Sequence, residues 1–302
     1  MYQPWGDMNQ ESVPLDVLER LSDDLDDLTP EARKAARYVL ENPRDAGMLT
    51  VREIADAANV KPNTLVRMAR QIGFEGYEDF REPLREAIRS GRASLPERAR
   101  WLQDMQRGGG LSNLYGEMIS DALENIDATF AGISKDDLES AAKAIWNSRD
   151  VYTMGVGVNS GIANCFTYLA RTCMVQFHAV PRPGSTAIDD ITWADQQDVL
   201  IAITSHPYRT EVVEAVEQAR KQGMTIIALS DSPASPIIRA ADHGFVMSVN
   251  TSQFFPSSVT SILLLETLLS FVISVATEKV VARAETFHER RRQLGFYVED
   301  QK

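Results

Sequence analysis

The fold of the N-terminal region is decided by residues 49–77, which read LTVREIADAANVKPNTLVRMARQIGFEGY. Thr50 and Glu53 have the spacing of a capping box, so a short helix is expected to begin after Thr50. Asn59–Val60 then turns the chain, and apolar residues at helical spacing predict a second helix from Pro62 to Ile72, ended by a glycine. Two short helices joined by a tight turn form a helix-turn-helix candidate.

The second helix of this pair is predicted to have one apolar and one polar face. The polar face carries amide, hydroxyl and guanidinium groups, and such groups read base edges, since Arg bonds bidentately to guanine and Asn to adenine. Lysine and threonine near the helix starts can hold phosphates. The residues predicted to contact DNA are Thr50, Lys61, Asn63, Thr64, Arg67 and Arg70. A merely solvated face of a small helical bundle is the alternative.

Charge is distributed unevenly along the chain. The 302 residues carry a formal net charge of -12, which on average argues against a partner as anionic as DNA. Residues 1–28 hold eight acids and one base, whereas residues 29–100 hold fourteen bases and eleven acids. Within that basic block, residues 57–74 contain three bases and no acid. This window can meet phosphates inside an otherwise acidic protein.

Capping residues, prolines and glycines predict the division into domains. Thr29–Pro30 opens a helix, and a further helix from Tyr77 to Ser90 is expected to pack its aromatic residues on the other three. Glycines, Pro96 and mixed charge then indicate a linker. The predicted parts are an acidic leader without assigned function at 1–28, a helix-turn-helix domain at 29–92, a linker at 93–113, an α/β domain at 114–285 and a tail at 286–302.

The second half of the chain contains five apolar runs separated by helical stretches. Continuous rather than alternating apolar strands are typical of a parallel sheet covered on both faces, so a doubly wound five-stranded α/β domain is predicted. The runs are Val151–Met154, Met174–Ala179, Val199–Ile203, Thr225–Leu229 and Gly244–Val249.

Ligands of such sheets bind outside the carboxyl ends of the strands, where helix N-termini point N–H groups at anions. The loops after the first and third strands therefore carry the candidate binding residues, together with the serines that precede the long apolar helix. The predicted ligand-binding residues are Gly155, Gly157, Asn159, Ser160, Thr204, Ser205, His206, Arg209, Ser257 and Ser258. Ser230–Pro233, after the fourth strand, is expected to open another helix.

The common cofactor and metal motifs are incomplete. The third glycine of a dinucleotide fingerprint would fall at Ser160, and no acid follows the second strand. The histidines at 178, 206, 243 and 288 lack metal-ligand spacing, and Cys165 and Cys173 form no CxxC. We expect no cofactor, no metal and no disulfide, and the cysteine usage favours a reducing cytoplasm. The N-terminal residues contain no secretory signal pattern.

One stretch, Ser257–Thr277, reaches the length of a membrane span. Glu266 lies at its centre and Ser or Thr recur throughout, which favours a buried core or subunit-interface helix over a span. No membrane partner is therefore expected.

The N-terminal segment resembles a known family. Residues 28–88, and Gly73-Phe74-Glu75-Gly76-Tyr77 in particular, resemble the DNA-binding domain of RpiR-type transcriptional regulators. Residues 114–280 are similar in organisation to the SIS (sugar isomerase) domain that these regulators join to it. The resemblance implies a helix-turn-helix regulator of double-stranded operator DNA with an effector-binding SIS domain.

The candidate sensor loops depart from the pattern of the SIS family. Phosphosugar-binding SIS domains usually have Gly-x-Gly-x-Ser after strand one, where this chain has Asn159, and Ser-x-Ser-Gly-x-Thr after strand three. Here the second serine is His206, the glycine is Pro207 and the threonine is Arg209. Arg209 at a helix N-terminus can grip a phosphate or a carboxylate, so a small anionic effector is predicted, with a sugar phosphate as one candidate.

Other interpretations stay open. Arg209 can instead form a surface ion pair with Glu211 or Asp231. A phosphosugar isomerase, with His206 and a neighbouring carboxylate as its acid and base, is the alternative function, and a non-sensing scaffold is a third. Because one helix-turn-helix covers little groove surface, we expect a homodimer or homotetramer, with the helix at 257–278 contributing contact area.

Overall fold

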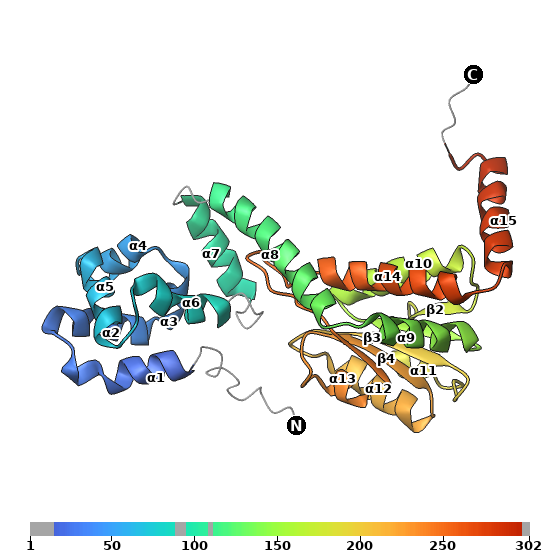
Figure 1. Cartoon of the computed structure of the whole chain (residues 1–302), viewed down its shortest axis with the longest axis horizontal. Coiled ribbons are helices and arrows are strands. Elements are labelled where there is room, and N and C mark those ends of the chain that lie inside the picture. Colours follow the sequence, from blue (N-terminus) through green and yellow to red (C-terminus); the bar gives the residue numbers. More distant parts are fainter. Residues whose placement is uncertain (1–14, 88–94, 108–110, 298–302) are drawn as a thin grey trace, which may run out of the picture. The chain divides into compact units, whose positions relative to one another are not determined.

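The structure of the chain is a computed structural model that describes residues 15–87, 95–107 and 111–297 (Figure 1). The chain forms two compact units. The first extends to Asp121 and also includes residues 250–256, and the second begins at Ala122 and holds the remainder. The division therefore falls within one helix, α8 (Leu111–Ala131).

The first unit contains a small helical domain, drawn in blue to cyan in Figure 1. Helix α2 (Pro30–Glu41) begins after Thr29, and α4 (Val51–Ala57) begins after a complete capping box. Helix α5 (Pro62–Gln71) has a proline at its start, and Gly73 follows with a φ of +88°, a conformation that favours glycine. The predicted pair of short helices joined by a tight turn is therefore confirmed as α4 and α5.

The core of this domain is formed by the apolar faces of its helices. Helix α6 (Tyr77–Ala87) contributes Phe80, whose ring packs edge-on against Phe74 at 5.5 Å between centroids. The predicted apolar face of α5 is buried in this core, as are the aromatic residues of α6. Its largest fully buried side chains are Leu21, Ile54, Leu65, Met68, Ile72, Phe80 and Leu84.

Three helices lie in segments for which the sequence analysis gave no helix bounds. Helix α1 (Leu15–Asp23), followed by the single turn η1 (Leu25–Asp27), adds Val17 and Leu21 to the core. Helices α3 (Pro43–Met48) and α7 (Leu95–Arg107) each have a proline in the first turn. Proline is compatible with that position because the N–H it lacks has no helical partner there, so these prolines start helices instead of marking breaks.

The second unit is built on a five-stranded, all-parallel sheet with the strand order β2-β1-β3-β4-β5. This confirms the predicted doubly wound sheet, although the second strand starts later than predicted. The strands are β1 (Val151–Gly155), β2 (Phe177–Val180), β3 (Val199–Ile203), β4 (Thr225–Ser230) and β5 (His243–Val246).

Helices cover both faces of the sheet, as Figure 1 shows. One face packs against α9 (Lys135–Asn147), α10 (Val158–Arg171) and α14 (Val259–Val275). The other face packs against α11, α12 and α13, with bounds Ala187–Asp190, Thr210–Lys221 and Pro236–Ala240. Alternate residues of β3 enter the two cores, which explains why the strand is apolar throughout.

The helix after β4 begins later than the sequence predicted. Ser230–Pro233 was expected to open it, but α13 begins only after Ser235. The Ser235 hydroxyl is buried and accepts from Ser230 Oγ at 2.8 Å, and Pro236 takes the first helical position. A proline that fixes the first turn therefore outweighs the capping signal earlier in the loop.

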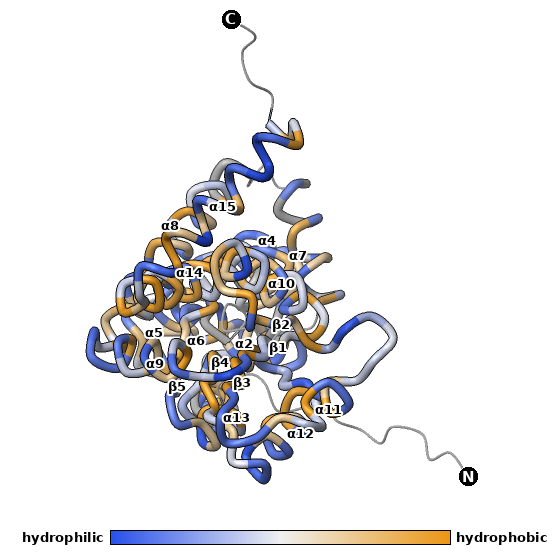
Figure 2. Tube along the Cα trace, turned by 90° about the vertical axis from the view of Figure 1, so that its right-hand side faces the viewer, coloured by the Kyte–Doolittle hydropathy of each residue, from blue (hydrophilic) through white to orange (hydrophobic). Residues whose placement is uncertain are grey.

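The long apolar stretch forms α14, most of which packs into the sheet core. Among the described residues, no one helix has both the length and the apolar content of a membrane span. Helix α14 passes such a test only when joined to α15 (Lys279–Gln293), from which it is bent by 117°. In Figure 2 the end of α15 nearest the C-terminus is blue, in keeping with the basic run Arg290–Arg292.

Candidate functional site

Helix α5 separates its side chains into a buried and an exposed face. Asn63, Arg67 and Arg70 are exposed and lie on one side, because three and four residues correspond to about one helical turn. Lys61 occupies the N-cap position, and Thr64 is half-buried. The structure thus brings five of the six predicted DNA contacts to one helix and its start.

The sixth predicted DNA contact, Thr50, is engaged in the capping box of α4. Its N–H donates to Glu53 Oε2 at 2.7 Å and its hydroxyl donates to the same oxygen at 2.6 Å. Thr50 Oγ1 in turn accepts from the Glu53 N–H at 3.3 Å. Both donors of Thr50 are therefore occupied within the protein.

The two arginines of α5 differ in what they contact. Arg70 Nε donates to the Glu75 carbonyl at 3.0 Å and so ties the helix to the following loop. Arg67 makes no hydrogen bond or ion pair with the residues that the structure describes. Gln71, four residues after Arg67 and also exposed, shares the polar face. The helical spacing predicts Gln71 on this face, although it was not among the six predicted DNA contacts.

The turn between α4 and α5 is held from outside. Asn59 has a left-handed φ of 51°, which asparagine tolerates better than most residues, and its carbonyl accepts from Lys34 Nζ at 2.8 Å. This bond fixes the turn to α2. The turn is therefore held by a contact outside the helix pair in addition to the core that the two helices share.

The candidate sensor lies where the strand order reverses, between β1 and β3. Helix α10 leaves β1 on one face of the sheet and α12 leaves β3 on the other, so two helix N-termini flank this crevice. A Cβ on Gly155 would lie 2.2 Å from the Asn159 carbonyl, and Gly157 has a φ of +64°. Both glycines are thus required by the turn itself.

The polar side chains of the loops after β1 and β3 differ in the hydrogen bonds that they make. Ser160 Oγ donates to the Gly157 carbonyl at 2.7 Å, within its own loop. Thr204 is buried, and its hydroxyl accepts from the Arg209 N–H at the long distance of 3.5 Å. The side chains of Asn159 and Ser205 make no hydrogen bond within the described part of the chain.

The loop after β3 is braced by the loop after β4. The His206 backbone N–H donates to Asp231 Oδ2 at 3.2 Å, and the peptide between His206 and Pro207 is cis. Burial and then the negative charge of Asp231 raise the pKa of Tyr208. Asp231 thus binds the backbone of the loop and not the imidazole of His206.

Arg209 occupies the N-cap position of α12, and its guanidinium pairs with Glu211 at 2.7 Å. The hydrogen bond that the Arg209 guanidinium donates to Glu211 raises the pKa of Arg209, and the same bond lowers the pKa of Glu211. Both side chains are about half exposed. The ion-pair alternative is therefore the arrangement seen here.

The predicted serines at the start of α14 lie beside the chain that leaves β5. The Ser257 N–H donates to the Val249 carbonyl at 3.1 Å, and Thr260 Oγ1 donates to the Ser248 carbonyl at 2.8 Å. Ser258 is the N-cap residue. Among the described contacts, none links these serines to the loops of β1 or β3.

A second cation follows β2 and was missed by the sequence argument. Arg182 pairs with the buried carboxylate of Asp190 at 2.8 Å, and Ser185 Oγ donates to the same carboxylate. Burial acts to raise the pKa of Asp190, but the hydrogen bonds from Arg182 and Ser185 prevail and lower it. The signal lies in residues 178–185, HAVPRPGS, where an arginine and a serine directly follow the second strand.

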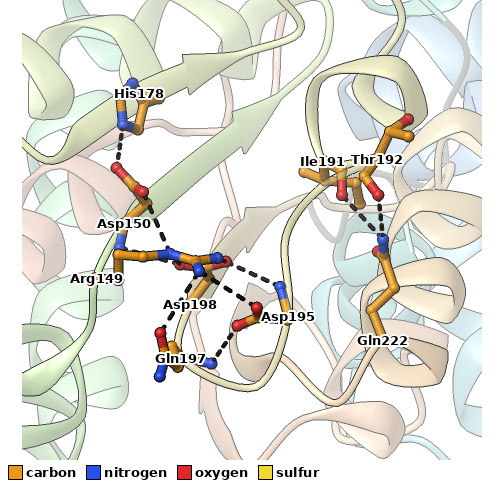
Figure 3. Close-up of polar contacts among 9 residues, drawn as sticks. All are labelled: Arg149, Asp150, His178, Ile191, Thr192, Asp195, Gln197, Asp198 and Gln222. Atoms are coloured by element: carbon orange, nitrogen blue, oxygen red, sulfur yellow. Dashed lines mark hydrogen bonds and ion pairs between the residues drawn. The ribbon is translucent and has the colours of Figure 1, made fainter.

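The opposite edge of the sheet carries a polar cluster, shown in Figure 3. Buried Asp198 accepts from Arg149 Nε at 3.0 Å and from the N–H groups of Asp150 and Asp195. Asp150 contacts His178 Nε2 at 2.7 Å. These bonds connect the beginnings of β1, β2 and β3, and so brace the sheet at the edge away from the candidate sensor.

Sequence comparison finds two known domains in this chain. The helix-turn-helix domain of the rpiR family matches residues 15–91, and the SIS domain matches residues 144–271. An uncharacterised HTH-type transcriptional regulator of Caldanaerobacter subterraneus is 26% identical over 87% of this chain and 91% of its own length. The HTH-type transcriptional regulator HexR of Pseudomonas aeruginosa is 23% identical over 74% of this chain and 76% of its own.

Solved structures share the fold. The Vibrio vulnificus NanR protein, complexed with ManNAc-6P, has 20% identity and a TM-score of 0.54 over 94% of this chain and all of its own. The sugar isomerase domain of an RpiR transcription factor from Sphaerobacter thermophilus has 23% identity and a TM-score of 0.55 over 58% of this chain and 98% of its own. With both domains matched in order, the chain belongs to the RpiR-type transcriptional regulators, which join an rpiR-family helix-turn-helix domain to a SIS domain.

Proposed function

We propose that this regulator binds double-stranded operator DNA through α5 and that a small anionic metabolite, bound at the carboxyl edge of β1 and β3, changes its affinity for that DNA. The supporting observation for the DNA contact is the exposed polar face of α5, on which Arg67 makes no hydrogen bond or ion pair with the described residues. We propose that Arg67 and Asn63 read bases and that Lys61 holds a phosphate.

The effector site is supported by the position of Arg209 at the switch point between β1 and β3. A guanidinium at the start of α12 and the N-terminus of α10 on the other face present positive potential to one crevice. The related NanR protein was solved with the sugar phosphate ManNAc-6P. A sugar phosphate is accordingly one candidate here, and a carboxylate is another, because Pro207 and Arg209 replace residues of the usual phosphate loop.

The isomerase alternative has less support. It requires the His206 imidazole to share a proton with a carboxylate, whereas Asp231 accepts from the His206 backbone N–H. The relatives with names are transcriptional regulators. We therefore propose a regulator without catalytic activity, which acts in the cytoplasm as a homo-oligomer.

The test begins with selection of a duplex from random DNA by the full-length protein, followed by titration of that duplex. A panel of hexose 6-phosphates, 2-acetamido hexose 6-phosphates and small carboxylates is then added to the titration and, separately, to a thermal unfolding assay. One of these compounds is expected both to raise the unfolding temperature, since it binds the native state, and to shift the duplex affinity. If no duplex is enriched, the DNA proposal fails; if no compound acts in either assay, the effector proposal fails.

A further inference from the structure

The loops at the two edges of the sheet differ in charge. The loops that follow the strands hold two arginines, Arg182 and Arg209, and a single acid, Asp231. The loops that precede the strands hold one arginine and four acids. The loops after the strands are residues 156–157, 181–186, 204–209, 231–235 and 247–258, and those before them are residues 148–150, 172–176, 191–198, 222–224 and 241–242. In a chain of net charge -12, the carboxyl edge is therefore the edge of the sheet that attracts anions.

Arg182 leaves the sheet beside the loop of β1. Val180, the last residue of β2, is paired with Met154 of β1, so residues 181–186 begin next to the glycine loop that follows β1. Helices α11 and α12 pack into the core on the same face of the sheet. Arg182 and Arg209 therefore follow the two strands that flank β1, and each precedes a helix on that face.

The backbone around Arg182 is fixed. The Ser185 N–H donates to the Arg182 carbonyl at 3.0 Å, with Pro183 second in the turn and Gly184 third at a φ of +82°, features typical of a type II turn. Asp190, whose side chain is 1% exposed, accepts from the Arg182 N–H at 2.6 Å and from Ser185 Oγ at 2.8 Å. The turn is thus braced against α11.

The guanidinium of Arg182 is held on one side and accessible on the other. Its Nε and Nη2 atoms contact Asp190, each at 2.8 Å, whereas Nη1 donates to none of the residues that the structure describes. The side chain is nevertheless 70% exposed. A guanidinium that is already oriented loses little conformational entropy when it binds an anion. The neighbouring acid Asp189 is occupied in the capping box of α11, where it accepts from the N–H and the hydroxyl of Thr186.

The loop after β3 also offers unused donors. The Thr204 hydroxyl is buried and accepts from the Arg209 N–H, but its own proton finds no acceptor in the described part of the chain. Neighbouring strands lie about 4.8 Å apart, so β2 and β3, with β1 between them, are about 10 Å apart. Two anionic groups, one at each arginine, are therefore separate groups of one molecule and not two oxygens of one phosphate.

We propose that the effector of this regulator carries two separated anionic groups, one bound by Arg209 and the other by Arg182. Phosphorylated sugar acids and sugar bisphosphates share this chemistry. The inference rests on the proposed effector site, because Arg209 marks the first of the two anion contacts. Asp190 is the positioning residue that orients the second guanidinium.

Calorimetric titration of the full-length protein with matched compounds tests the proposal. The compounds are a hexose 6-phosphate, the corresponding hexose 1,6-bisphosphate and the 6-phosphoaldonate, in which a carboxylate replaces the first carbon's carbonyl. Small carboxylates with one and with two acid groups extend the comparison. At least one compound with two anionic ends is expected to bind at least about tenfold more tightly than its counterpart with one.

Two variants assign that preference to the guanidinium. Arg182→Ala is expected to weaken binding of the compound with two anionic ends by about tenfold and to leave binding of its counterpart with one unchanged. Ser185→Ala is the matched control, because it removes another hydrogen bond to Asp190 and keeps the guanidinium. The control should retain the preference, even if its unfolding temperature falls.

The outcomes separate this inference from the proposed effector site. If no compound binds, the effector site and the inference both fail. If compounds with one anionic end bind as tightly as those with two, or if Arg182→Ala weakens both classes equally, the second anion contact is overturned and the effector site stands. Loss of the preference in Ser185→Ala to the same extent as in Arg182→Ala would assign it to the shape of the loop and overturn the role of the guanidinium.

Discussion

Arg209 shows how a single residue can be both an ion-pair partner and a candidate ligand contact. Its guanidinium faces Glu211 at 2.7 Å, and both side chains are about half exposed. An ion pair in such a setting contributes little to stability because water competes for both charges. An anionic metabolite that offers two oxygens can therefore replace Glu211 as the partner of Arg209 at small cost.

Arg209→Ala is expected to abolish the effect of the metabolite on DNA affinity and to leave DNA binding without metabolite unchanged. The guanidinium would contact the metabolite, whereas the DNA contacts belong to another domain, and the two communicate only through a coupling free energy. Titration of the selected duplex with and without the active compound measures both quantities. Glu211→Gln is the matched control and should keep the response. A wild-type response in the Arg209 variant would move the site to Asn159, Ser160 and the Ser257–Ser258 loop.

The two arginines of α5 are expected to differ when each is replaced by alanine. Arg67→Ala should weaken binding of the selected duplex by about 1 to 3 kcal/mol, the cost of a lost base contact, with unchanged thermal unfolding. Arg70→Ala should also weaken binding, but with a lower unfolding temperature, because its bond to the Glu75 carbonyl is lost. Arg52→Ala, an exposed position on α4, serves as a comparison. Unchanged footprints for both α5 variants would remove this helix from the DNA groove.

At the scale of elements, the loop between β2 and α11 depends on one buried carboxylate. Asp190 accepts from the Arg182 N–H, from its guanidinium and from Ser185 Oγ, and its pKa is lowered. A lowered native pKa contributes stability above the ordinary pKa of aspartate, and this contribution is lost as the pH falls through the lowered value.

Asp190→Asn is accordingly expected to reduce the free energy of unfolding at pH 7 by about 1 to 2 kcal/mol, because the amide replaces charge-assisted bonds with weaker ones. The difference from wild type should narrow in acid, where the wild-type carboxylate is itself protonated. Urea unfolding at pH 7 and at pH 3 measures the difference in free energy of unfolding between the variant and the wild type. Asp127→Asn, at an exposed carboxylate, is the control; equal losses in the two variants at pH 7 would refute this role of Asp190.

Elements with strong local signals could be predicted from the sequence, and those decided by distant contacts could not. The capping box of α4 and the five apolar strands depend on residues close together in the sequence. Both predictions are confirmed. Helix α7 was missed because Pro96 read as a breaker, although a proline in the first turn is tolerated. For the acidic leader a short helix and a mobile arm were both open, and helix α1 forms there because Val17 and Leu21 enter the core.

The candidate site was predictable in place but not in its contacts. Topology alone put the loops after β1 and β3 at one edge, since all parallel strands end there. The partners of its side chains depend on rotamers and on residues far along the chain. Asp231 reaches the backbone of His206 across 25 residues, and no periodicity in the sequence signals that bond.

For the whole molecule, the exposed apolar residues of the second unit bear on assembly. Helices α10 and α14, which share one face of the sheet, leave apolar side chains exposed, among them Tyr168, Val259, Ile262 and Ile273. Patches of this kind are typical of protein interfaces.

The chain is expected to sediment and scatter light as a dimer or tetramer at micromolar concentration. Ile262→Glu should shift it towards monomer, because a carboxylate would be desolvated in the contact, and should reduce duplex affinity in parallel. Thr286→Glu, at an exposed position on α15, is the control for added charge. A monomer in the wild type, or an Ile262 variant that stays fully associated, would count against this interface.

The strand order also bears on the sequence of events during synthesis. Strand β1 is synthesised first, yet it lies inside the sheet between β2 and β3. Its neighbour Arg149 can bond to Asp198 only after a further 49 residues have been synthesised. A nascent β1 therefore leaves the ribosome with both edges unpaired, and it stays so until β2 and then β3 have emerged. The helical domain ahead of it closes through short-range contacts and is free to fold early. The interval between the two events is when an apolar strand of this chain is exposed to chaperones and to other nascent chains.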